Sequence, residues 1–109
     1  MTINVVLCTA PDEDTAKHIA HELVSMEYAA CVNILPKITS VYRWDGKVTQ
    51  DQEVQLIIKT AAQQVDRAYE LVCGLHPYDV PEWIVLEASA SDSYRAWMHD
   101  VTKTTKEPS

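Results

Sequence analysis

The chain has 109 residues, of which 47% are hydrophobic and 23% are charged. This length is enough for one buried core and too short for two. A formal net charge of -7 argues against nucleic acid or anionic membrane as the main partner, because both need clustered lysine and arginine. No apolar run approaches the roughly 20 residues of a membrane span, and Met1 is not followed by the basic start of a signal peptide. We therefore expect one cytoplasmic domain over residues 1–109, with a core over 3–101 and a frayed tail over 102–109.

The first strand is predicted over Ile3 to Thr9, an almost continuous apolar run that is typical of a buried central strand. Pro11 ends this run, and the three carboxylates at positions 12–14 then suit the positive end of a helix. Apolar residues recur at helical spacing from Ala16 to Val24, and the helix should end near Glu27. The pattern predicts a helix with one face packed on a sheet.

A long β-hairpin is predicted over Ala29 to Thr60, with its turn at Asp45-Gly46. A two-residue type I′ turn needs positive φ at both positions, which Asp and Gly tolerate. This turn places Trp44 opposite Lys47. Apolar and polar residues alternate on the return arm from Val54 to Lys59, as in a strand with one buried face. Pro36 cannot donate to a β-ladder and therefore marks a bulge or an edge.

The length of this hairpin predicts self-association. Arms of roughly 14 residues at about 3.3 Å per residue span about 45 Å, whereas a chain of this size has a radius of gyration of about 13 Å. The hairpin should therefore extend beyond its own domain and carry Val41, Tyr42, Trp44 and Val48 into solvent. Because exposed apolar strands are normally covered, we expect a closed homo-oligomer.

The remainder of the chain predicts a helix over Ala61 to Leu75, an irregular loop over His76 to Glu82, a strand over Trp83 to Ala88 and a last helix capped by Ser91 or Asp92. The resulting order is β-α-β-β-α-β plus a C-terminal helix. It predicts an α+β, ferredoxin-like sandwich with a long central hairpin.

Three stretches of the sequence carry a family resemblance: LCTAPDEDTA from Leu7, AACVNILPKITSVYRWDGKV from Ala29 and HPYDVPE from His76. Together they resemble the CutA family, the divalent-cation tolerance proteins, in register over nearly the whole chain. The resemblance implies a ferredoxin-like subunit, a homotrimer built through the long strands, and a link to tolerance of copper and other divalent metals. It also implies a similarity in architecture to the PII signalling proteins, which bind small effectors between subunits.

The resemblance implies a copper site as well. The copper ligands of the family fall on Cys8 and His76 here, and thiolate and imidazole both suit copper. Some members have two adjacent histidines where this chain has Leu75-His76, so the site would need Glu82, water or a neighbouring subunit to complete it. The structural alternatives are packing for Cys8 and hydrogen bonding within the loop for His76.

A second candidate site consists of Glu53, Lys59, Tyr78 and Glu82, which could converge in a cleft between subunits. The interpretation that we favour is that they form interface salt bridges and hydrogen bonds. No hydrolase, metalloprotease or phosphate-loop motif is present, so we expect no enzyme. The predicted function is a homotrimeric metal-binding protein for copper or divalent-cation tolerance; the alternatives are a PII-like small-molecule sensor and a trimeric anchoring module.

Overall fold

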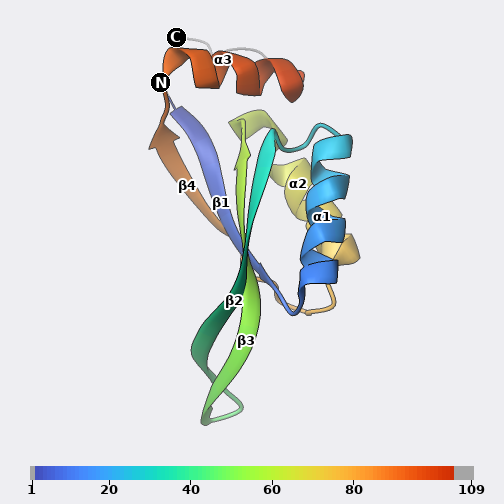
Figure 1. The fold of residues 1–109 in the computed structure, drawn as a ribbon, viewed down its shortest axis with the longest axis vertical. Helices are drawn as coiled ribbons and strands as arrows, with labels where there is room; N and C mark the ends of the chain where they lie inside the picture. The colour runs from blue at the N-terminus through green and yellow to red at the C-terminus, as the bar shows by residue number, and fades with distance from the viewer. Residues whose placement is uncertain (1, 105–109) are drawn as a thin grey trace.

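The computed structural model describes residues 2–104 of the chain. The elements follow one another in the predicted order (Figure 1): β1 (Thr2–Ala10), α1 (Glu13–Ser25), β2 (Cys31–Trp44), β3 (Lys47–Thr60), a 3-10 helix η1 (Ala62–Gln64), α2 (Val65–Leu75), β4 (Ile84–Ser89) and α3 (Asp92–Val101). The predicted second helix thus begins as a 3-10 turn, and the last strand begins at Ile84, one residue later than expected, since its ladder with β1 ends at the pair Leu7 and Ile84.

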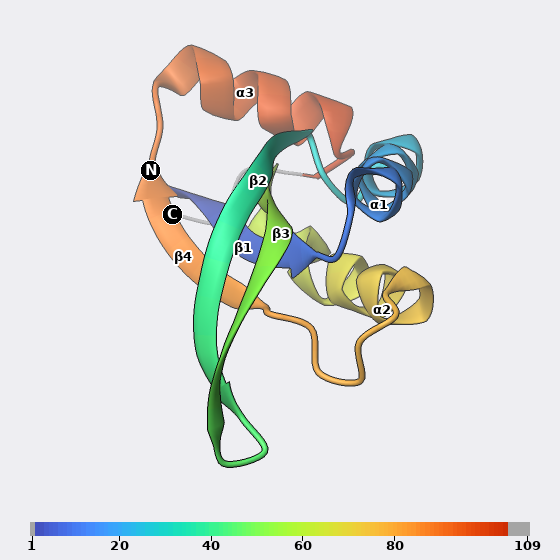
Figure 2. The same ribbon diagram turned by 60° about the horizontal axis from the view of Figure 1, so that its bottom comes forward.

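The four strands form one antiparallel sheet in the order β2-β3-β1-β4. Figures 1 and 2 show α1 and α2 together on one face of this sheet, while α3 lies across the end of the sheet farthest from the hairpin turn. This arrangement confirms the predicted ferredoxin-like α+β fold with a long central hairpin and an extra C-terminal helix.

The main core lies between the sheet and the two helices. The side chains that point from the sheet into this core belong to alternate residues of the two central strands, as the two-residue period of a strand requires. They are the buried Val6, Cys8 and Ala10 of β1 and Val54, Leu56 and Ile58 of β3. The intervening residues of both strands therefore face the other side of the sheet.

The hairpin has the predicted turn and register. Asp45 and Gly46 adopt φ angles of 53° and 76°, and Trp44 pairs with Lys47. The ladder is interrupted between Leu35 and Ile38, so the bulge predicted from Pro36 is confirmed.

The distal part of the hairpin extends away from the domain (Figure 1), and the molecule measures 47 Å along its longest axis. In the single chain Val41, Trp44 and Val48 are 64%, 71% and 69% exposed. The predicted overhang with its apolar side chains is therefore present.

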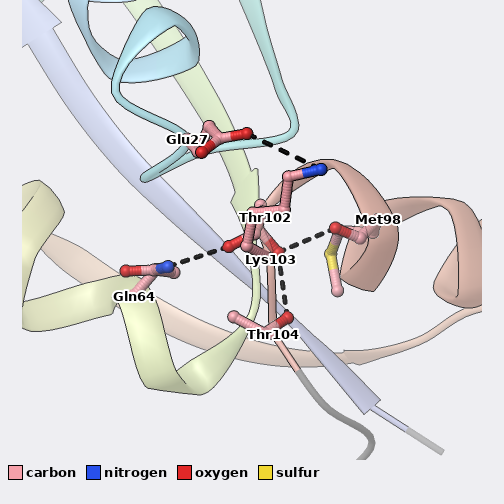
Figure 3. A network of polar contacts seen from close by, with 6 residues as sticks. All are labelled: Glu27, Gln64, Met98, Thr102, Lys103 and Thr104. Atoms are coloured by element: carbon pink, nitrogen blue, oxygen red, sulfur yellow. Dashed lines mark hydrogen bonds and ion pairs between the residues drawn. The ribbon is translucent and has the colours of Figure 1, made fainter.

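The expectation of a frayed tail beginning at Thr102 is wrong for the first residues of that segment. Thr102 is fully buried, its hydroxyl donates to the Met98 carbonyl at 2.8 Å, and its own carbonyl accepts from Gln64 Nε2 at 2.9 Å (Figure 3). Lys103 then adopts a φ of 54° and forms an ion pair with Glu27 at 4.0 Å. These contacts with distant segments hold residues 102–104 in place, although their polar composition is typical of a frayed terminus. Positions 105–109 lie outside the described residues.

Candidate ligand cleft

The candidate site lies on the face of the sheet opposite α1 and α2. Thr9 of β1 pairs with Gln55 of β3, and cross-strand partners point to the same side of a sheet. Asp51 and Glu53 precede Gln55 by two-residue steps and so share its face, and Asp51 pairs with Ser40 of β2. Alternation thus places a polar row on one side of β3 and the apolar core on the other.

The loop between α2 and β4 is fixed against this face by its first residue. His76 is buried, and its Nε2 lies 2.6 Å from the carbonyl oxygen of Thr9. Its Nδ1 accepts a hydrogen bond from the backbone N–H of Tyr78 at 3.1 Å. Because Nδ1 is an acceptor, the proton is on Nε2 and is donated to Thr9, and the imidazole is neutral.

Two further contacts fix the rest of the loop. The hydroxyl of Tyr78 donates to Glu53 Oε2 at 3.0 Å, and Gln55 Nε2 donates to Glu82 Oε1 at 3.3 Å. Gln55 also donates to the Cys8 carbonyl at 2.8 Å, which connects the loop to the centre of the sheet. The loop is irregular in backbone and yet held at both of its ends.

Between the loop and the distal hairpin lies an open cleft of about 810 Å³. Its acidic lining residues come from β3 and from the loop: Asp51, Glu53, Asp79 and Glu82. Its aromatic lining residues come from β2 and from the loop: Tyr42, Trp44 and Tyr78. Among the described residues that line it there is no lysine, arginine or histidine. The cleft is therefore suited to a cation.

The two phenols in the cleft remain protonated at neutral pH. Burial, followed by the hydrogen bond to Glu53, raises the pKa of Tyr78 to about 12. The hydroxyl of Tyr42 donates to Asp51, and this hydrogen bond raises the pKa of Tyr42 above its usual value. Both tyrosines therefore act as neutral donors that orient a carboxylate.

The residues expected to bind copper are arranged differently from a metal site. Cys8 is fully buried, and burial, followed by the nearby charge of Glu82, raises the pKa of its thiol to about 12. Both ring nitrogens of His76 are engaged by the backbone. Within residues 2–104, no three His, Cys, Asp or Glu side chains are close enough to hold a metal ion together. In the single chain Cys8 thus packs in the core and His76 hydrogen-bonds to the backbone, and a copper site completed by a neighbouring subunit stays a prediction.

Three of the four residues expected to converge in a cleft line this one: Glu53, Tyr78 and Glu82. Lys59 does not. It lies six positions beyond Glu53 on β3, roughly 20 Å along the strand, and pairs with Cys31 and Val5 at the opposite end of the sheet.

Sequence reasoning missed Asp51, Asp79 and Thr9. Asp51 could have been found, since Asp51 and Glu53 are two residues apart on the return arm and therefore point to the same face of the strand. No local signal marks Asp79, because only the folded loop brings it to the cleft, and Thr9 lies in an almost continuous apolar run whose two faces the sequence does not distinguish. None of the described helices is long and apolar enough to span a membrane.

Comparisons with known proteins agree with this fold. Residues 4–101 match the family described as CutA1 divalent ion tolerance protein. The divalent-cation tolerance protein CutA of Thermus thermophilus is 46% identical over 99 residues, covering 90% of this chain and 96% of that protein. The crystal structure of CutA from Xylella fastidiosa superposes with a TM-score of 0.89 at 40% identity, covering 92% of this chain and 97% of the other. A CutA of Archaeoglobus fulgidus, described as periplasmic, superposes with a TM-score of 0.89 at 29% identity, covering 94% of this chain and 99% of the other.

Proposed function

This chain belongs to the CutA1 family of divalent ion tolerance proteins, and on that basis we propose that it is a cytoplasmic, homotrimeric metal-binding protein, without catalytic activity, that contributes to tolerance of copper and other divalent cations. The observation that carries the binding role is the cleft, whose described lining residues include four carboxylates and no basic side chain. Carboxylate oxygens are good ligands for hard divalent cations, and a negative cleft raises the local concentration of cations.

We place the cation at the carboxylates of the cleft and not at Cys8 and His76. Copper bound by those two side chains would require a buried thiol to lose its proton and His76 to release a backbone contact. Glu82 belongs to both arrangements, since it lines the cleft and lies near Cys8. Cation binding at Glu53 and Glu82 needs neither change, and because no third such donor within residues 2–104 lies close enough to complete the site, water or a neighbouring subunit would supply the remaining ligands.

Calorimetric titration of the metal-free protein with Mn²⁺ and Zn²⁺, and anaerobic titration with Cu(I) against a competing chelator, test this placement. Two double variants are compared: Glu53→Gln with Glu82→Gln, and Cys8→Ser with His76→Ala. Loss of binding in the first pair alone supports the cleft. Loss of binding in the second pair alone supports the copper site at Cys8 and His76. Equal binding by the parent protein and both double variants contradicts both proposed sites.

The trimer is proposed from the edges of the sheet. The edge strand β2 carries the exposed Val41 and Trp44, and the edge strand β4 exposes Ile84, Val85 and Leu86 at 41–46%. Unpaired apolar edges of this kind are normally covered. We infer that three copies cover one another through the hairpin overhang, and light scattering should give three times the chain mass of 12.3 kDa. The variant Val48→Glu should dissociate the assembly, whereas Val24→Glu on the exposed side of α1 should not.

The size of the cleft favours a second candidate function, a small-molecule sensor of the PII type. A volume of about 810 Å³ is within the range of ligand pockets and is far larger than one ion requires. Ligand-dependent protection of the Tyr78 amide from hydrogen exchange would support sensing, and unchanged exchange with a metabolite library would oppose it.

A further inference from the structure

We draw no further inference here: the strongest candidate, the apolar side of the sheet opposite α1 and α2, where Ile84 and Leu86 of β4 lie exposed beside Leu7 of β1, belongs to the interface of the homotrimer already proposed, and nothing in the described part of the chain indicates another occupant for it.

Discussion

His76 and Thr9 are joined by a hydrogen bond of 2.6 Å between residues 67 positions apart in the chain. The same imidazole accepts the N–H of Tyr78, so a single neutral side chain holds the loop against the end of β1. A histidine between two backbone partners positions Tyr78 and Glu82 at the cleft. His76 thus shapes the candidate site although it is not among the described residues that line the cleft.

Removal of this imidazole should loosen the loop. We expect His76→Ala to lower the free energy of unfolding by about 2 kcal/mol, since it removes a buried hydrogen bond to the Thr9 carbonyl and the acceptor of the Tyr78 amide. Urea denaturation measures the loss, and faster hydrogen exchange at Tyr78 locates it. The matched control His18→Ala, on an exposed position of α1, should change stability by less than about 0.5 kcal/mol. Equal effects of the two variants would contradict this role.

The buried thiol of Cys8 predicts a loss of stability in alkaline solution. In the unfolded chain the thiol has a pKa near 9.0, whereas in the folded protein burial raises this pKa to about 12. Between these values the unfolded state binds fewer protons than the folded state, so the free energy of unfolding falls as pH rises.

Urea denaturation from about pH 8 to about pH 11 should show this decline, with a shallower slope for Cys8→Ala. The exposed Cys73 provides the control, because Cys73→Ala should keep the slope of the parent protein. If the free energy of unfolding of Cys8→Ala falls with pH as steeply as that of the parent protein, groups other than Cys8 cause the loss of stability in alkaline solution.

Replacement of the two glycines by alanine should change the stability of the protein in opposite directions. Gly46 lies in the hairpin turn at φ +76°, where a Cβ is strained although no neighbour is within 4 Å. Gly46→Ala should therefore destabilise the protein by about 1 kcal/mol. Gly74 lies within α2, also with no atom within 4 Å of an added Cβ, and Gly74→Ala should stabilise by about 0.5–1 kcal/mol. Thermal unfolding of both variants checks the signs.

Arg95 on α3 should be replaceable by an apolar residue of similar length. It is 5% exposed, its Nε has no hydrogen-bond partner in the described part of the chain, and its ion pair with the exposed Asp92 is long at 3.7 Å. A buried charge paired this weakly contributes little stability. We expect Arg95→Met to leave the free energy of unfolding unchanged or to raise it by about 1 kcal/mol.

The control for this replacement is Arg95→Ala, which should destabilise by about 1–3 kcal/mol because the packing of the aliphatic stem is lost. Chemical denaturation of both variants gives the comparison. A large loss in Arg95→Met would indicate a partner for the guanidinium beyond those found within residues 2–104.

The sequence by itself determined the order of the elements, the hairpin turn at Asp45-Gly46, its register, the bulge near Pro36 and the buried face of β3. These features follow from turn chemistry and from the two-residue period, which act between neighbours in the chain. Family membership also followed from three short stretches in order.

Only the tertiary structure decided the composition of the cleft, the engagement of both nitrogens of His76, the burial of Thr102 and the distance of Lys59 from the cleft of its own chain. Each depends on contacts between residues far apart in sequence: Thr9 with His76, Gln64 with Thr102, and Glu53 with Tyr78. Local patterns carry no information on such distances, because packing of helices and loops on the sheet sets them. The two-residue period of β3 places Asp51 on the same face as Glu53, but only the folded loop brings Asp79 and Glu82 to the same cleft.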